Sequence, residues 1–114
     1  MLKKHLRLKK RKSFNYIHRR GKNIGNETLS LVFVYARTKD SPIKIGFSVS
    51  KKIGNSVKRH RAIRLLRAAA STLTDRIKPD HSLIFIAKEG LDKKHLTEIV
   101  AAMENVLKRG GLLI

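Results

Sequence analysis

Residues 48–67, SVSKKIGNSVKRHRAIRLLR, change from the period of a strand to the period of a helix within one short turn. Before the turn, residues 43–50 alternate, so apolar side chains point to one face and small or polar ones to the other. We expect the polar face to be open to water or a ligand; it carries Lys44, Gly46, Ser48 and Ser50.

After Gly54-Asn55, Ser56 is a suitable cap for a helix that runs to about Leu73. The apolar face of that helix is Ala62, Leu66, Ala69, Ala70 and Leu73. Such a stretch requires a fold in which helices cover a sheet.

The rest of the chain continues this pattern. The sequence predicts a helix over 13–20, capped by Ser13 and ended by Gly21, then a strand over 28–37 with both faces apolar and a turn at 38–42. A third strand is predicted over 82–88 and a last helix over about 91–109, ended by Gly110-Gly111. The order α-β-β-α-β-α predicts an α+β sandwich. We expect one domain, 1–114, with a basic N-terminal arm at 1–12.

Positive charge is concentrated in the first part of the chain. The whole sequence has 27 Lys and Arg against 8 Asp and Glu, a formal net charge of +19. Residues 1–67 contain 20 of the cations but only Glu27 and Asp40 as acids. This asymmetry predicts a polyanionic partner. An anionic membrane is the weaker rival, because the basic segments contain turns, strands and a polar strand face and are not one long amphipathic helix.

Few residues are suited to catalysis by the protein itself. There is no cysteine, and the five histidines show no i, i+4 pair, so we predict no metal site on this chain. The basic part also lacks the carboxylate cluster that a metal-dependent nuclease needs. We find no secretory signal and no apolar run long enough to span a membrane, so a cytoplasmic location is expected.

The helix after Gly54-Asn55 is the best candidate for polyanion binding. Arg61, Arg64 and Arg67 recur about one turn apart, and each guanidinium can bind phosphate oxygens in bidentate fashion. A solvated basic surface is the alternative, but no acid is interleaved with the row, which favours nucleic acid. Phe14 fits core packing and base stacking equally well.

The segment FSVSKKIGNSVKRHRAIRLLR closely resembles the signature of the bacterial ribonuclease P protein subunit, and RLKKRKSFNYIHRRGK and SLIFIAK resemble flanking parts of that family. The resemblance implies an α/β sandwich with a left-handed β-α-β crossover, an exception to the usual handedness. It also implies that the protein assists a catalytic RNA, which removes the 5′ leader of precursor tRNA. Catalytic groups and most of the bound Mg²⁺ would then belong to the RNA.

The resemblance assigns two groups of site residues. The group expected to bind the RNA subunit is Lys51, Lys52, Asn55, Lys58, Arg59, His60, Arg61, Arg64 and Arg67. The group expected to line a cleft for the leader is Phe14, His18, Phe33, Lys44, Ser48, Ser50 and Lys88. The expected partners are ribonuclease P RNA and precursor tRNA, with no membrane and no obligate protein partner. Three positions depart from the family pattern: His60 replaces a usual Asn, Ile63 a common basic residue, and His18 a second cleft aromatic.

Two other classes of nucleic-acid-binding protein remain open. A small basic ribosomal protein would bind RNA for a structural purpose only. A DNA-binding module would need a recognition helix that reads bases, yet the exposed arc of the Arg-rich helix has no Asn or Gln. The RNA that copurifies with the protein would separate the first class from the ribonuclease P subunit.

Overall fold

The computed structural model describes residues 7–8, 11–35 and 43–114. In chain order the elements, with η for short 3₁₀ helices, are α1 Arg11–Arg20, β1 Lys22–Gly25, β2 Leu29–Tyr35, β3 Lys44–Ser48, η2 Lys51–Ile53, α2 Ser56–Leu73, η3 Thr74–Arg76, β4 His81–Ala87, η4 Leu91–Lys93 and α3 Leu96–Arg109. The four strands form one sheet in the order β1-β2-β4-β3. β1 and β4 pair with β2 in antiparallel fashion, and β3 pairs with β4 in parallel.

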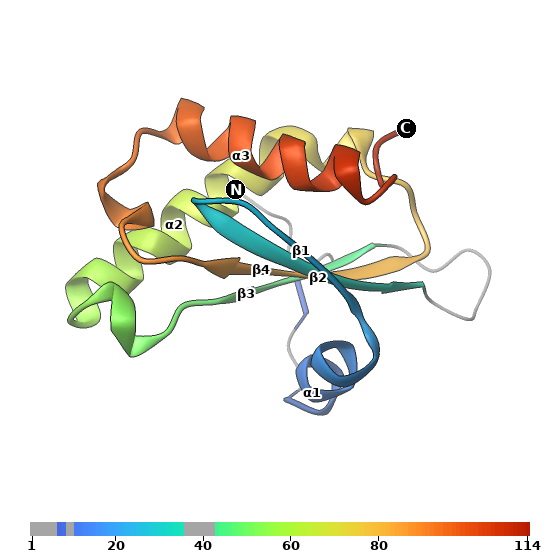
Figure 1. Ribbon diagram of the computed structural model, residues 1–114, viewed down its shortest axis with the longest axis horizontal. Coiled ribbons are helices and arrows are strands. Elements are labelled where there is room, and N and C mark those ends of the chain that lie inside the picture. The colour runs from blue at the N-terminus through green and yellow to red at the C-terminus, as the bar shows by residue number, and fades with distance from the viewer. Residues whose placement is uncertain (1–6, 9–10, 36–42) are drawn as a thin grey trace.

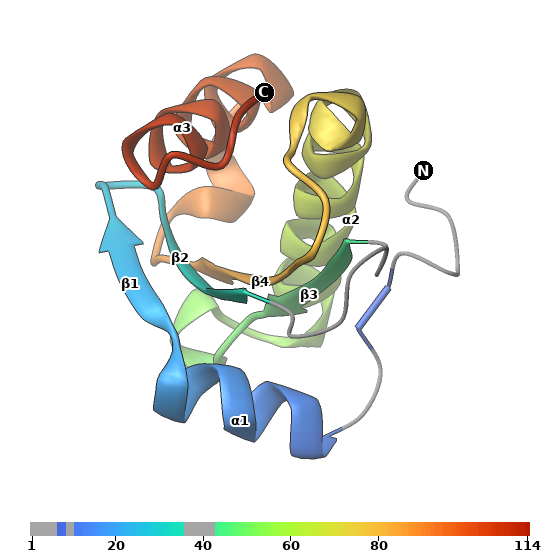
Figure 2. The same ribbon diagram turned by 90° about the vertical axis from the view of Figure 1, so that its right-hand side faces the viewer.

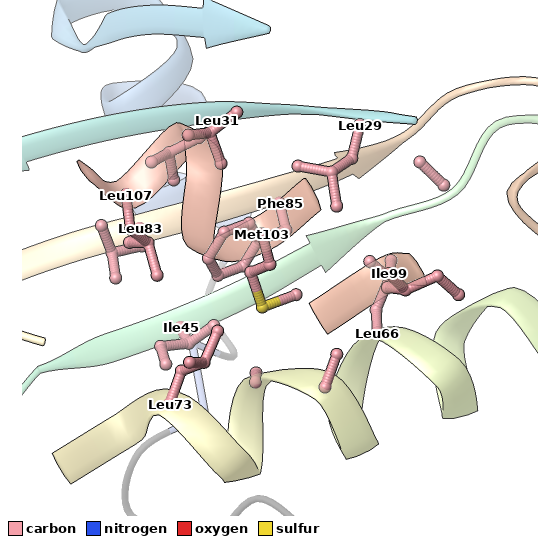
Figure 3. Packing of buried hydrophobic residues seen from close by; sticks show 14 of the residues in the cluster. Leu29, Leu31, Ile45, Leu66, Leu73, Leu83, Phe85, Ile99, Met103 and Leu107 are labelled. Atoms are coloured by element: carbon pink, nitrogen blue, oxygen red, sulfur yellow. The ribbon is translucent and has the colours of Figure 1, made fainter. Parts of the chain in front are cut away.

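The sheet has helices on both faces. α2 and α3 cover one face side by side, and α1 crosses the other (Figures 1 and 2). The larger core lies between the sheet and the two-helix layer, where Phe85 and Met103 are fully buried (Figure 3). A smaller core forms where Ile17 of α1 packs on Val32 and Ile84. Most apolar burial, and therefore most of the hydrophobic stabilisation, is on the two-helix side.

The alternation of the strands explains which face each residue takes. β2 and β4 are the central strands, and both carry apolar side chains on their two faces, as predicted for residues 28–37. In β3, Ile45 and Phe47 face the two-helix layer, while Lys44, Gly46 and Ser48 face α1. β3 is at one edge of the sheet, where Arg7 pairs with Ile45 in an isolated parallel bridge.

The connection from β3 through α2 to β4 is a parallel crossover. In Figure 2 both strands run away from the viewer, β3 lies to the right of β4, and α2 returns above them. The path is therefore left-handed, although such connections are right-handed in about 98% of cases. The geometry places the N-terminus of α2 beside the end of β3, where the basic residues are concentrated (Figure 1).

The structure confirms the α+β class and the predicted order of elements, and it adds one strand. β1 was missed because a four-residue strand with two exposed positions shows little alternation. α1 begins at Arg11, so Ser13 is not its cap and the predicted arm at 1–12 overlaps the helix. The predicted last helix is divided into η4 and α3 by extended backbone at Lys94 and His95. The predicted turn at 38–42 and most of the arm lie outside the described residues.

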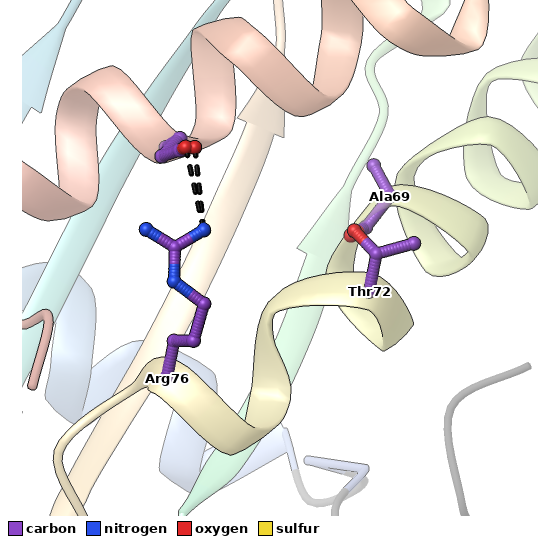
Figure 4. A network of polar contacts seen from close by, with 4 residues as sticks. Ala69, Thr72 and Arg76 are labelled. Carbon is purple, nitrogen blue, oxygen red and sulfur yellow. Dashed lines mark hydrogen bonds and ion pairs between the residues drawn. The ribbon is translucent and has the colours of Figure 1, made fainter.

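Among the described residues, one ion pair joins η3, which directly follows α2, to α3. Nη1 of Arg76 lies 3.4 Å from both carboxylate oxygens of Glu104 (Figure 4). Their side chains are 53% and 34% exposed, so this pair contributes at most about 1 kcal/mol. Thr72 donates its hydroxyl hydrogen to the carbonyl of Ala69 within the helix. The two helices are therefore held together mainly by their apolar faces.

Candidate nucleic-acid interface

The start of α2 is fixed by a glycine and an asparagine. Gly54 has a φ of +141°, which side-chain-bearing residues rarely adopt. Asn55, and not the predicted Ser56, is the cap: its Oδ1 accepts the N–H of Lys58 at 3.0 Å. Just before it, Ser50 Oγ accepts the N–H of Lys52 at 3.3 Å and caps η2. The sequence SKKIGN therefore forms a defined turn that sets the direction of the basic helix.

Most of the predicted RNA-subunit group lies at the surface of this turn and helix. α2 contains no acidic residue, and the ion pairs in the described parts of the chain involve none of its cations. Arg59 and Arg67 are half-buried, and their Nε atoms are buried without a hydrogen-bond partner among the described residues. The other seven members are exposed: Lys51, Lys52, Asn55, Lys58, His60, Arg61 and Arg64. α2 thus presents uncompensated positive charge to the solvent.

The sheet face below α1 is the second candidate surface. Strand pairing arranges its residues in rows across the sheet. α1 packs over the row of Asn23, Val32, Ile84 and Gly46. The next row, called here the serine row, is Gly25, Ser30, Ile86 and Ser48. All four of its members are half-buried, so this small and mostly polar row is partly open beside α1.

Phe14 borders this surface from α1. A Cβ atom at Gly46 would lie 2.6 Å from Cζ of Phe14 and 3.1 Å from Cδ2 of Leu8, so only glycine admits the ring there. The expectation that the whole polar face of β3 is open is therefore wrong at Gly46, which is buried. Phe14 is itself half-buried and packs against Ile17, while His18 is exposed. Phe14 thus contributes to the small core and keeps part of its ring accessible.

Phe33 does not belong to this surface. It lies on the opposite face of β2 and packs with the larger core, where a Cβ atom at Gly110 would be 3.2 Å from its Cε1. Phe33 and Phe14 are therefore on different faces of the sheet, which corrects their predicted place in one cleft. The cleft assignment of Phe33 came from the family resemblance; because β2 is apolar on both faces, alternation alone did not show which face Phe33 takes.

The other predicted cleft residues are distributed along the α1 face. Ser48 lies in the serine row, and Lys44 lies at the opposite end of β3, in register with Ser82. Ser50 is exposed, but its hydroxyl is the η2 cap. Lys88 is exposed just beyond β4, and its Nζ donates a hydrogen bond to the carbonyl of Asn26. Ser48 and Lys88 therefore lie close to the open row, whereas Lys44 is remote from it.

A cavity of about 280 Å³ connects the two candidate surfaces at the outer edge of β3. Its walls are Arg7, Leu8, Phe14, Ile45, Gly46, Phe47, Ile63 and Arg67. Leu8 donates its N–H to the carbonyl of Ile45 at 2.8 Å, so the chain at Leu8 covers the outer edge of β3 at this residue. Arg67, assigned from sequence to the RNA-subunit group, thus shares a hollow with Phe14, assigned to the leader cleft.

Gly25 and Ser30 are surface residues that the sequence did not reveal as candidates. Gly25 lies in β1, which was not predicted, and Ser30 lies in the predicted strand β2 but faces Gly25 only through the pairing of β2 with β1. The available signal was the Gly-Asn pair at 25–26, which is typical of a hairpin turn between strands.

The described residues contain neither a metal-binding cluster of side chains nor a membrane-spanning helix. No group of three or more His, Cys, Asp or Glu side chains is placed to hold a metal ion in the described part of the chain. None of the helices there is both long and apolar enough to cross a membrane.

Comparison with known proteins supplies the family. The family model described as Ribonuclease P matches residues 2–111. The ribonuclease P protein component of Clostridium novyi is 36% identical over 97% of this chain and 98% of its own length. That of Enterococcus faecalis is 35% identical, with 98% and 94% covered. The solved structure of the Staphylococcus aureus RNase P protein has a TM-score of 0.83 at 26% identity, covering 96% of this chain and 98% of the other.

The fold and surface define a small basic α+β protein with a left-handed crossover and an uncompensated arginine helix. The Thermotoga maritima RNase P protein has the same fold, with a TM-score of 0.79 at 22% identity and coverage of 90% and 96%. This chain belongs to the ribonuclease P protein family.

Proposed function

We propose that this chain is the protein subunit of ribonuclease P, binds the catalytic RNA subunit and the 5′ leader of precursor tRNA, and assists removal of the leader. The observation that carries the proposal is the exposed cation row of α2, which has no acidic residue in the helix and no ion pair among the described residues. It occurs in a chain whose family membership is established over nearly its full length.

In this proposal the two surfaces have different tasks. The exposed turn and outer arc of α2 bind phosphates of the RNA subunit through Lys51, Lys52, Arg61 and Arg64. The α1 face of the sheet binds the leader, since small residues in the serine row let a single strand approach the backbone. Phe14 offers the accessible part of its ring at the border of that row.

Catalysis is assigned to the RNA subunit. We expect the RNA to bind most of the Mg²⁺ and to supply the catalytic groups. The sequence agrees with that assignment, because the basic part of the chain, residues 1–67, has only two carboxylate side chains that could bind metal ions. The protein contributes affinity and orientation, which reduce the entropic cost of bringing the leader to the RNA.

Reconstitution tests the proposal. The protein is combined with a bacterial ribonuclease P RNA, and cleavage of precursor tRNA is followed at a Mg²⁺ concentration where the RNA alone is slow. We expect strong stimulation by the protein and none by an equally basic unrelated protein. RNA-free protein should cleave nothing. Cleavage by RNA-free protein, or no stimulation of the RNA, would contradict the proposed function.

A further inference from the structure

Gly25, Ser30 and Lys88 form a polar corner at the β1 end of the serine row. Gly25 is in register with Ser30, and Lys88 directly follows β4. A Cβ atom at Gly25 would lie 2.9 Å from Ser30 Oγ and 3.3 Å from Lys88 Nζ. A hydroxyl and an ammonium group therefore converge over a backbone position that has no side chain.

The ammonium group is held in place at this corner. Lys88 Nζ donates to the carbonyl of Asn26, the first residue of the β1–β2 turn. Asn26 is itself fixed, because its Oδ1 accepts the N–H groups of Thr28 and Leu29, each at 3.0 Å. Its Nδ2 donates to the carbonyl of Ala102 in α3 at 3.0 Å. The turn is thus anchored to α3, and a flexible lysine gains a defined position.

A second contact strengthens this anchor. Arg109, at the end of α3, donates from Nη1 to the carbonyl of Gly25 at 2.9 Å. Nδ2 of Asn26 also lies 3.3 Å from Oδ1 of Asn105. The backbone under the corner is therefore connected to a helix on the other face of the sheet.

The corner has positive charge and spare hydrogen-bond donors. Lys88 forms no ion pair in the described parts of the chain, and its sequence neighbour Glu89 is exposed and unpaired there. An ammonium group has three donors, of which Asn26 takes one. The other donors and the Ser30 hydroxyl suit an anion with several acceptor oxygens. The missing side chain at Gly25 lets such an anion approach the backbone.

We propose that the corner of Gly25, Ser30 and Lys88 binds one phosphodiester group of single-stranded RNA, with Asn26 as the positioning residue. The inference rests on the proposed function, under which this RNA is the leader of precursor tRNA. Gly25 on β1 and Ser48 on β3 lie at the two ends of the serine row, three strand spacings or about 14 Å apart. A leader that crosses the serine row from Phe14 therefore reaches the corner a few nucleotides further along.

Gly25→Ala tests the corner with little effect on folding. The new Cβ atom would meet only the far ends of two flexible side chains, Ser30 Oγ and Lys88 Nζ, besides a backbone oxygen at 3.8 Å. Both ends can move aside, so the melting temperature should stay near that of the wild type while the phosphate position is blocked. We expect roughly fivefold weaker binding of precursor tRNA by the reconstituted enzyme, the effect of losing one phosphate contact.

Matched variants separate this effect from general charge loss. Lys88→Gln should weaken precursor binding by a similar factor, and adding Gly25→Ala to it should cause little further loss, because both act on one site. Lys93→Gln removes an exposed lysine of η4 that lies outside the corner, and it should leave precursor affinity unchanged. Fully additive losses, or an equal loss in Lys93→Gln, would overturn the proposal.

The source of the phosphate is identified by comparing RNAs. Binding of mature tRNA by the reconstituted enzyme, and of the RNA subunit by the protein alone, should not change in Gly25→Ala. A loss confined to the RNA subunit would overturn assignment to the leader. In a series of precursors with one neutral methylphosphonate each, one leader position should weaken wild-type binding but have no effect on Gly25→Ala. Absence of any such position would overturn the phosphate site.

The outcome also separates this inference from the proposed function. If the wild-type protein does not stimulate cleavage, the proposed function fails. Suppose instead that the wild type stimulates cleavage and that Gly25→Ala keeps the wild-type ratio of precursor to mature tRNA affinity. The proposed corner is then wrong, while the proposed function stands.

Discussion

Phe14 is the residue at which stability and binding are most closely combined. Its ring packs with the small core of Ile17, Val32 and Ile84, yet the side chain is only half-buried. Phe14→Ala should therefore cost about 2 kcal/mol of folding free energy, less than the ~3–5 kcal/mol of a fully buried Phe. If the exposed part stacks on a base, precursor tRNA should also bind at least about fivefold more weakly. Melting curves and affinities for precursor and mature tRNA measure both effects; equal losses for the two RNAs would refute the stacking role.

A substitution at Gly46 perturbs the same surface from the sheet, beneath the ring of Phe14. Gly46→Ala places a Cβ atom against the Phe14 ring, so the ring must shift, at a cost of about 1–3 kcal/mol. Gly110→Ala is the matched control, because its Cβ atom would meet Ile24 and Phe33 on the opposite face, at 3.1 and 3.2 Å. We expect both variants to melt earlier, but only Gly46→Ala to reduce the preference for precursor over mature tRNA. The same reduction in Gly110→Ala would show that the preference follows stability.

At the scale of elements, the cap of α2 distinguishes two adjacent residues. Asn55→Ala should lower the folding free energy by about 0.5–2 kcal/mol, because the N–H of Lys58 loses its acceptor. Ser56→Ala should change it by only a few tenths of a kcal/mol, because Ser56 is the first helical residue and not the cap. Denaturant unfolding of both variants compares them directly. A larger loss in Ser56→Ala would contradict the position of the helix start.

The outer arc of α2 should contribute to binding but not to stability. Arg61 and Arg64 are exposed, and neither takes part in an ion pair within the described chain. Replacing both with Ala should lower the slope of log affinity for the RNA subunit against log salt by about one unit per lost phosphate contact. The melting temperature should stay close to that of the wild type. An unchanged slope between 50 and 200 mM salt, with full affinity, would show that this arc does not contact RNA.

At the scale of the whole molecule, the sequence predicted element types better than positions. Periodicity identified α2, α3 and β3, because each has one long apolar face, whereas β2 and β4 were identified by their apolar and β-branched content on both faces. β1 was not predicted, because it has only four residues and its place in the sheet depends on pairing with β2. The left-handed crossover came only from the family resemblance, since residue patterns carry no information on handedness.

The residues of the candidate site were likewise predicted only in part. The cations of α2 could be predicted because helical periodicity gives both the face and its exposure. The family resemblance placed Phe33 on the wrong face of β2, and alternation could not correct it, because β2 is apolar on both faces and the partner of each face depends on tertiary packing. The corner at Gly25 was not predictable for a related reason: it joins β1, β2 and the end of β4, which are far apart in the sequence.

The central claim is that one small domain has separate surfaces for two RNAs, on α2 and on the α1 face of the sheet. The most direct test measures two quantities for the Arg61→Ala/Arg64→Ala protein and for Gly46→Ala: affinity for the RNA subunit, and the ratio of precursor to mature tRNA affinity in the reconstituted enzyme. We predict that the arginine variant loses RNA-subunit affinity and keeps the ratio, whereas Gly46→Ala keeps RNA-subunit affinity and loses the ratio. Parallel losses of both quantities in both variants would contradict two separate surfaces.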